Sequence, residues 1–329
     1  MSSPTAGVTL ASLQASVKPR LITVQEELRR IIQSDFGLIA EVNSHLLQMQ
    51  GKMFRPTLLL LAEAASGASD PRAETHAAVV ELIHLATLVH DDSVDHSVLR
   101  RGMPTINALF SHQISVIMGD YLYSRAVVEL TRLGDIEPLR VLSRVTNEMT
   151  VGEMRQLLAH EPLDFTEEAY DLLIRAKTAS LLSGACEVGA LSAGTREREV
   201  LRRFGEAVGM AFQIVDDLLD YTEEEAVTGK PSGNDLREHK VTLPLIYALP
   251  RLSPEGRREV TALMATAEPT DIQIGRVIGL VGDAGGLEYA RERANQLAEQ
   301  ADRELDDLPP SHAREILRDS ITYMLDRRR

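Results

Sequence analysis

The chain contains little of several residue types, and each shortage excludes a class of protein. Cys186 is the only cysteine among 329 residues. A single cysteine forms neither an intrachain disulfide nor a cysteine-based zinc site, and it fits the reducing conditions of the cytoplasm. The N-terminus lacks the pattern of a secretion signal, and no apolar run approaches the roughly 18 residues of a membrane-spanning helix. We therefore expect a cytoplasmic protein with at most a peripheral membrane contact.

Basic residues are scarce relative to acidic ones. The chain has 35 Lys and Arg against 49 Asp and Glu, which gives a net charge of −14. Such a chain does not attract nucleic acid as a whole, so we expect no nucleic-acid partner. An anionic ligand would instead need local basic clusters or a metal ion.

Aromatic residues make up only 4% of the chain and tryptophan is absent, whereas 44% of the residues are hydrophobic. The core is therefore expected to consist mainly of aliphatic side chains, which suits packed helices. Apolar residues recur at three- and four-residue steps along almost the whole chain, and the breaks are too short to be domain linkers. We predict one all-α domain over residues 1–329, with about ten to thirteen helices.

One acidic pattern, D-D-x-x-D, occurs twice, at residues 91–95 and 216–220. On a helix its three carboxylates fall within an arc of roughly 100°. They repel one another, and burying them without a cation is costly. Magnesium usually joins a few carboxylates to substrate phosphates. The paired motifs therefore predict a metal-bridged phosphate site between two facing helices.

Cationic residues accompany both motifs. Arg100 and Arg101 follow the first motif, and arginine forks suit phosphate oxygens. Lys177 interrupts an apolar helix, where a buried lysine needs an anionic partner. Lys230 lies in a loop with two glycines and a proline that is able to close over a diphosphate. The alternative for the first motif is a solvated helix end with local salt bridges, which the recurrence of the pattern disfavours. The alternative for the second motif is an N-cap or a surface acidic patch.

These motifs, in this order from about Gly51 to Leu249, resemble those of the trans-isoprenyl diphosphate synthases, or polyprenyl synthetases, of the medium- and long-chain type that includes heptaprenyl, octaprenyl and solanesyl diphosphate synthases. The resemblance implies the all-α isoprenoid synthase fold around a central cavity, and usually a homodimer. It also implies a magnesium-dependent prenyltransferase that condenses isopentenyl diphosphate with an allylic diphosphate (geranyl, farnesyl or longer). Three Mg²⁺ ions per site are expected once substrate is bound.

The resemblance assigns roles to individual residues of this chain. The metal ligands are Asp91, Asp92, Asp95, Asp216, Asp217 and Asp220. The residues expected to bind the allylic diphosphate are Arg100, Gln156, Lys177, Lys230 and Lys240. The residues expected to bind isopentenyl diphosphate are Lys52, Arg55, His84 and Arg101. Lys177, Thr178 and Gln213 are the expected catalytic residues, beside the allylic cation.

Two positions depart from the family pattern. Gln50 stands where many relatives have a second glycine, and His239 stands where glycine usually precedes the lysine numbered 240 here. The second departure puts the closing geometry of the loop in question.

Product length in this family depends on residues just before the first acidic motif, where bulky aromatics stop the chain early. Here Ala86 and Thr87 occupy those positions, and neither is large. The resemblance therefore favours a product of about heptaprenyl to decaprenyl length, of the kind used as a quinone side chain. A farnesyl or geranylgeranyl product is the alternative. In that case Tyr123 or Leu130 would close the end of the product cavity.

Other functions remain to be distinguished. A class I terpene cyclase usually has a different second metal motif, and a non-catalytic subunit typically loses its acidic motifs; both motifs are intact here. A catalytic subunit that needs a separate partner is compatible with the sequence.

Overall fold

The computed structural model describes residues 7–49, 51–157, 162–222 and 233–326. Within these ranges thirteen α-helices have eight or more residues, four are shorter, and the only strands form one short hairpin. The all-α prediction is confirmed. The chain divides into two compact units. The first comprises Met1–Thr146, Leu181–Arg202 and Leu305–Asp319, and the second comprises Asn147–Ser180, Arg203–Glu304 and Ser320–Arg329.

The first unit begins with α1 (Leu10–Gln14), α2 (Lys18–Ile32), α3 (Gly37–Gln48), α4 (Phe54–Ala65) and α5 (Ala73–Val94). The hairpin β1 (Leu99–Arg100) and β2 (Met103–Pro104) follows, and then α6 (Ile106–Leu109) and α7 (His112–Leu133). The unit also contains the start of α8 (Ile136–Leu157), most of α10 (Ser180–Gly189), and the starts of α11 (Thr195–Thr222) and α18 (His312–Leu325).

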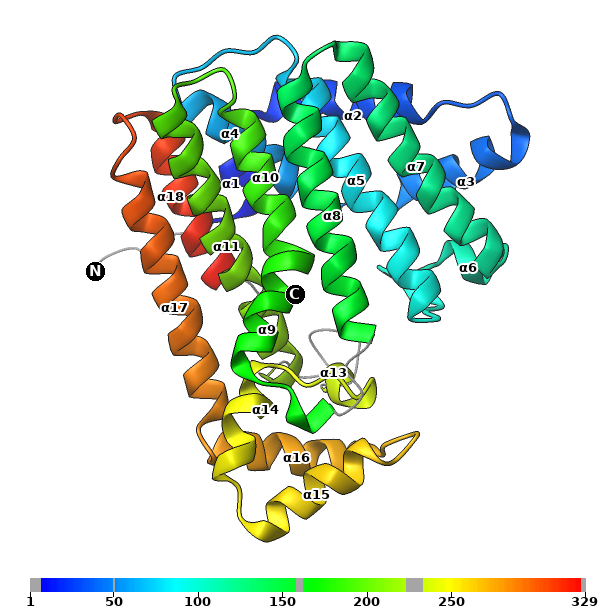
Figure 1. Cartoon of the computed structure of the whole chain (residues 1–329), viewed down its shortest axis with the longest axis vertical. Helices are drawn as coiled ribbons and strands as arrows, with labels where there is room; N and C mark the ends of the chain where they lie inside the picture. The colour runs from blue at the N-terminus through cyan, green and yellow to red at the C-terminus, as the bar shows by residue number, and fades with distance from the viewer. Residues whose placement is uncertain (1–6, 50, 158–161, 223–232, 327–329) are drawn as a thin grey trace. The chain divides into compact units, whose positions relative to one another are not determined.

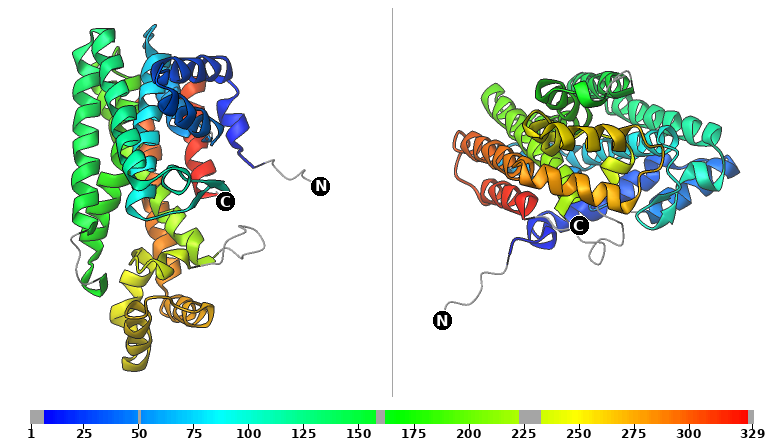
Figure 2. Two further views of the ribbon diagram at one scale, coloured as in Figure 1. Left: turned by 90° about the vertical axis from the view of Figure 1, so that its right-hand side faces the viewer. Right: turned by 90° about the horizontal axis from the view of Figure 1, so that it is seen from below.

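Helix α5 is the buried centre of the first unit. It packs against α2, α4 and α7 (Figures 1 and 2). Residues 77–80 of α5 are Ala and Val, and all four are fully buried. A helix that is apolar on every side has no solvent face, so other helices surround it. The first acidic motif therefore projects from the end of a packed helix.

The second unit contains the short 3₁₀ turn η1 (Pro162–Asp164), α9 (Glu167–Ile174) and a π-helical turn, η2 (Arg175–Ala179). Its later elements are α13 (Asn234–Arg237), α14 (Leu243–Ala248), the 3₁₀ turn η3 (Leu249–Arg251), α15 (Pro254–Met264), α16 (Asp271–Asp283) and α17 (Gly286–Leu305).

A cluster of buried side chains anchors the C-terminal end of α11 in the second unit. Tyr221 belongs to this cluster with Leu236, Leu245 and Val260. Helix α14 packs against α9 and α16, and α15 packs against α16 (Figure 1). The second acidic motif directly precedes Tyr221, so packing of this core sets its position.

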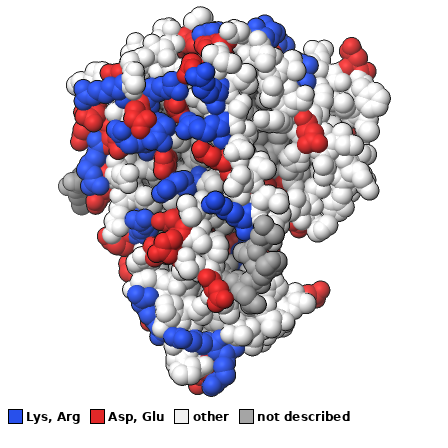
Figure 3. Space-filling model, viewed as in Figure 1, with Lys and Arg blue, Asp and Glu red and all other residues white. Residues whose placement is uncertain are grey.

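Charged side chains on the first unit are paired rather than segregated. Figure 3 shows basic and acidic side chains close together on the face that includes α10 and α11. Glu187 lies 2.8 Å from Arg198 Nη2 and 2.5 Å from Arg144 Nη2, and Arg198 also pairs with Glu137. Neighbouring carboxylates thus neutralise these arginines. Among the described residues, no helix has both the length and the apolar character needed to cross a bilayer.

Candidate active site

The first acidic motif lies at the C-terminal end of α5. Asp92 is buried, Asp91 is half-buried and Asp95, the C-cap residue, is exposed. The negative end of the helix dipole is here, so three carboxylates at this position are unfavourable unless a cation compensates them. The local structure therefore fits a cation site.

Arg100 is one compensating cation. The hairpin returns it to the end of α5, where its Nε lies 2.8 Å from both carboxylate oxygens of Asp92. Two groups that the resemblance assigns to a metal and a diphosphate thus form an ion pair with each other. The turn of the hairpin includes Arg101, whose φ of 52° lies in the left-handed region. That conformation costs a non-glycine residue about 1–2 kcal/mol, and such strain concentrates at functional sites.

The residues assigned to isopentenyl diphosphate gather around Gly51. A Cβ added to Gly51 would lie 3.1 Å from Arg101 Nη1 and 3.1 Å from Glu81 Oε1. Arg101 Nη1 also donates to the carbonyl of Met49 at 2.8 Å. Glycine therefore lets the guanidinium approach the backbone before α4. Arg55 belongs to the same group, because its charge shifts the pKa of Glu81.

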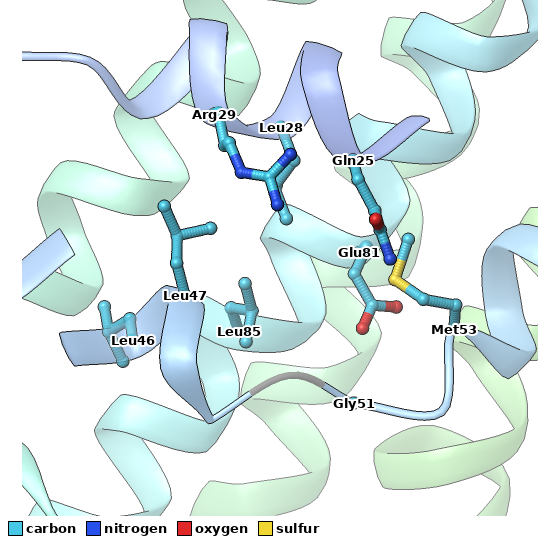
Figure 4. Close-up of a pocket in the computed structure, with 9 residues that line it drawn as sticks. All are labelled: Gln25, Leu28, Arg29, Leu46, Leu47, Gly51, Met53, Glu81 and Leu85. Carbon is cyan, nitrogen blue, oxygen red and sulfur yellow. The ribbon is translucent and has the colours of Figure 1, made fainter. Parts of the chain in front are cut away.

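A small cavity adjoins this group, and in Figure 4 the carboxylate of Glu81 points toward the backbone at Gly51. Its volume is about 20 Å³, which is room for about one water molecule. It is therefore too small to receive a prenyl chain. The lining residues are Gln25, Leu28, Arg29, Leu46, Leu47, Gly51, Met53, Glu81 and Leu85.

Glu81 is a residue that sequence reasoning missed. It is only 4% exposed and precedes His84 by one turn of α5. Burial raises the pKa of its carboxyl, and the nearby Arg55 and Arg101 lower it. The available signal was an acidic residue inside an otherwise apolar stretch, three positions before His84.

His84 and Thr87 lie on the face of α5 that carries Asp91, and all three are partly exposed. The spacing of seven residues from His84 to Asp91 predicts this arrangement. Burial lowers the pKa of His84 well below its ordinary value, and Arg55, Arg101 and Arg100 lower it further. The ring is therefore neutral at neutral pH. Ala86, by contrast, is 3% exposed and points into the packed core.

The second acidic motif is held by hydrogen bonds within the second unit. Asp217 accepts from Tyr170 Oη at 2.6 Å and from Gln213 Nε2 at 2.7 Å. Asp220 accepts from the backbone N–H groups of residues 234 and 235, at the start of α13. Asp217 and Asp220 are buried and Asp216 is half-buried. Tyr170 was not foreseen, because it lies 47 residues from its partner.

The acidic groups of this unit are difficult to ionise together. Burial and the charges of Asp216 and Asp220 raise the pKa of Asp217 to about 7, although the hydrogen bonds from Tyr170 and Gln213 act in the opposite direction. Burial and the charges of Asp217 and Asp220 raise the pKa of Asp235 to about 8. A divalent cation would keep such carboxylates ionised, and oxygen donors suit magnesium. The residues present therefore fit a magnesium site.

No group of three or more His, Cys, Asp or Glu side chains within the described ranges is arranged to enclose a metal ion.

Lys177 lies in the π-helical turn η2. Its Nζ is 2.6 Å from Glu153 Oε2 and donates to Gln156 Oε1 at 3.3 Å. Thr178 Oγ1 donates to Gln213 Oε1 at 2.7 Å, so the three expected catalytic residues lie in one connected region. A π-helical turn inside a helix is frequent at functional sites.

Lys240 follows His239, whose φ of 57° is left-handed. Glycine adopts this conformation without steric cost, which explains physically why a glycine suits the position. The His239 ring nitrogen Nε2 lies 2.9 Å from the carbonyl of Thr266, and Lys240 Nζ lies 2.6 Å from Glu238. Lys230 and Gln50 lie outside the described residues.

We expect His239→Ala to be less stable than His239→Gly by about 1 kcal/mol. Both variants lose the ring contact with Thr266, so the difference between them isolates the cost of a Cβ in the left-handed region. Urea denaturation of the two variants measures it. Equal stabilities, or a more stable alanine variant, would contradict this account of the backbone.

Each unit thus contains one acidic motif together with cationic and polar residues that the resemblance assigns to substrate binding or catalysis. The first unit has residues 91–95 with Arg100, Arg101, Lys52, Arg55 and His84, and the second has residues 216–220 with Lys177, Thr178, Gln156, Gln213 and Lys240.

Comparison with known proteins identifies relatives along almost the whole chain. The model of the polyprenyl synthetase family matches residues 37–279. Heptaprenyl diphosphate synthase component 2 of Geobacillus stearothermophilus is 39% identical, with 96% of this chain and 98% of that protein covered. An all-trans-nonaprenyl-diphosphate synthase (geranyl-diphosphate specific) of Rhodobacter capsulatus is 41% identical, with 90% and 91% covered. A crystal structure of polyprenyl synthase from Caulobacter crescentus CB15, complexed with calcium and isoprenyl diphosphate, superposes with a TM-score of 0.92 at 32% identity, with 99% and 100% covered.

Proposed function

The chain belongs to the polyprenyl synthetase family, and from this premise we propose that it is a magnesium-dependent prenyltransferase that extends an allylic diphosphate with isopentenyl diphosphate. One observation carries the proposal: both acidic motifs are intact, and each has cations within its own unit. Carboxylates bind the metals while arginine and lysine bind phosphate, so the paired sets suit two diphosphate substrates.

We propose that the six motif aspartates hold Mg²⁺, three ions per site when substrate is bound. Bound there, Mg²⁺ would supply positive charge to the diphosphate leaving group and so favour ionisation of the allylic C–O bond. The Caulobacter relative, crystallised with calcium and isoprenyl diphosphate, supports a divalent cation at such a site.

The side chains of the protein bind the diphosphate groups, orient the two substrates and shield the allylic cation from water. Lys177, Arg100 and Lys240, with Lys230 and Gln156, hold the allylic diphosphate. Thr178 and Gln213, hydrogen-bonded to each other, direct oxygen atoms toward the allylic cation. Water must be excluded because this cation is short-lived. The double bond of isopentenyl diphosphate attacks the cation, and loss of a proton to the departing diphosphate regenerates an allylic product.

Lys52, Arg55, Arg101 and His84 hold the diphosphate of isopentenyl diphosphate in this proposal. Because His84 is neutral, we expect it to act as a hydrogen-bonding group. His84→Gln should then change the KM for isopentenyl diphosphate less than about threefold, and His84→Ala should raise it about tenfold. Steady-state kinetics on both variants test this.

The pH dependence follows from the lowered pKa of His84. KM should show no titration of His84 between about pH 6 and 8. Near pH 6.5 the unfolded chain binds a proton at His84 and the folded chain does not. The free energy of unfolding is therefore unaffected by His84 above about pH 6.5 and decreases as the pH falls below it. A KM that falls as the pH drops through 6.5 would instead indicate a cationic His84.

The product is proposed to be a trans-polyprenyl diphosphate of about C35–C50 for a quinone side chain, in keeping with the heptaprenyl and nonaprenyl relatives. A short-chain product is the alternative. A need for a second subunit is a further alternative, because the Geobacillus relative is called component 2.

The decisive experiment incubates the pure protein with Mg²⁺, farnesyl diphosphate and excess labelled isopentenyl diphosphate, and sizes the dephosphorylated products. Products of seven to ten isoprene units are expected. Products of three or four units would support the short-chain alternative. A cyclic hydrocarbon from the allylic substrate alone would point to a cyclase, and no product would point to a missing subunit.

We propose that α7 forms a homodimer interface. Val116, Ile117, Tyr123 and Val128 are apolar side chains on the solvent side of α7, between 36% and 62% exposed, and we call this group the α7 stripe. Figure 3 shows few charges over this helix. Exposed apolar stripes of this kind commonly mark subunit contacts.

Ile117→Glu should weaken such a dimer by at least about 30-fold, because it buries a charge in an apolar contact. Sedimentation velocity measures the change. Ile272→Glu on α16 is the matched control, since Ile272 is more exposed and lies outside the stripe. A monomeric parent protein, or an unchanged dimer in Ile117→Glu, would refute the interface.

We propose that residues 1–329 form one synthase domain, because the family match at residues 37–279 includes parts of both units. We also propose that the protein is cytoplasmic, because a single cysteine fits a reducing compartment.

A further inference from the structure

Glu153 forms an ion pair with Lys177 that neither the motifs nor the proposed roles require. Lys177 Nζ lies 2.6 Å from Glu153 Oε2, closer than its 3.3 Å hydrogen bond to Gln156. The residue assigned to an anionic substrate is therefore already bound to an anion of the protein itself.

The contact between α8 and the π-helical turn is built to permit this pair. A Cβ added to Gly152 would lie 2.7 Å from Cβ of Ala176, so only glycine allows the backbones to approach so closely. Glu153 and Gln156 are three residues apart on α8 and share one face of the helix. Both side chains can therefore reach the same ammonium group.

The pair is partly shielded from solvent. The side chains of Lys177 and Glu153 are 29% and 23% exposed. Screening by water is thus incomplete, and the carboxylate offsets much of the attraction that the ammonium exerts on an incoming anion. A diphosphate that binds Lys177 has to compete with Glu153.

We propose that Glu153 is a positioning residue, the resting counter-ion of Lys177, which promotes release of inorganic diphosphate from the allylic site after each condensation. The inference rests on the proposed function. Repeated elongation must empty that site once for every isoprene unit added. When diphosphate departs, Lys177 returns to Glu153, so the ammonium is not left uncompensated in a partly buried position.

The test is Glu153→Gln, which keeps the shape and a hydrogen-bond acceptor but removes the charge. Calorimetric titration of the full-length variant with inorganic diphosphate and Mg²⁺ should show binding about two- to fivefold tighter than in the parent protein. In steady-state assays, inhibition by diphosphate should strengthen by the same factor and kcat should fall, while KM for isopentenyl diphosphate stays constant. A purely structural role would not produce this pattern.

Glu206→Gln is the matched control. Glu206 Oε1 lies 3.2 Å from Nε of Arg175 in the same π-helical turn, so its substitution removes a neighbouring partly exposed ion pair without touching Lys177. Its diphosphate affinity should equal that of the parent protein. In a Lys177→Met background, Glu153→Gln should no longer tighten binding.

Unchanged or weaker diphosphate binding in Glu153→Gln would overturn the inference. Equal tightening in Glu206→Gln, or persistence of the effect without Lys177, would also overturn it, because either result indicates a general charge effect. Diphosphate binding is measured without turnover, so failure of the proposed condensation activity remains distinguishable from failure of this inference.

Discussion

Asp91→Asn and Asp216→Asn are each expected to lower kcat/KM at least about 10²–10³-fold. Each substitution keeps the size of the side chain and removes a charge that the metal needs. Asp91 and Asp216 are the better sites for this test because both are half-buried. Asp92 and Asp217 are buried and bonded to Arg100 and Tyr170, so replacing them would also disturb local structure.

The measurement is incorporation of labelled isopentenyl diphosphate over a range of Mg²⁺ concentrations. The double variant should be little worse than either single variant, since residues that act as one unit are not additive. Asp283→Asn, an exposed aspartate at the end of α16, serves as the control and should retain full activity. Near-normal turnover in either single variant would remove that motif from the proposed site.

Thr87→Phe is expected to shorten the product from about C35–C50 to about C20 or less. Thr87 lies one turn of α5 before Asp91, a rise of about 6 Å, on the same partly exposed face. A phenyl ring there would occupy the space into which the growing chain extends. Product sizing with farnesyl diphosphate as primer tests the expectation.

Ala86→Phe is the comparison variant for Thr87→Phe. It distinguishes a residue that lines the product cavity from one that packs in the core. Ala86 is buried, so a large side chain there overpacks the helix contacts and should cost about 1–3 kcal/mol of stability. Its melting temperature should fall while the surviving activity yields long products. If Ala86→Phe truncates the chain and Thr87→Phe does not, the assignment of the wall to the Thr87 face is wrong.

Much of the site was predictable because its signals are local. The three aspartates of each motif are neighbours on one helix, and the step from His84 to Asp91 is two turns, so spacing alone predicts their common face. Partners distant in sequence were not predictable. In the sequence Glu81 stands out only as an acidic residue inside an apolar stretch, and nothing there pairs Glu153 with Lys177. The importance of both appears only where the fold brings Gly51 and Lys177 next to them.

The amino-acid sequence by itself determined that this protein is helical, that it carries two metal-type acidic motifs, and which cations accompany them. These features depend on period and charge within a few turns of helix. Only the tertiary structure decided that Glu153 neutralises Lys177, that Tyr170 bonds Asp217, and that His239 occupies a left-handed position. The physical reason is that burial, pKa and ion pairing depend on the neighbours that packing brings to each residue. Many of these neighbours are distant in the sequence, and their separation along the chain does not predict that they will be in contact.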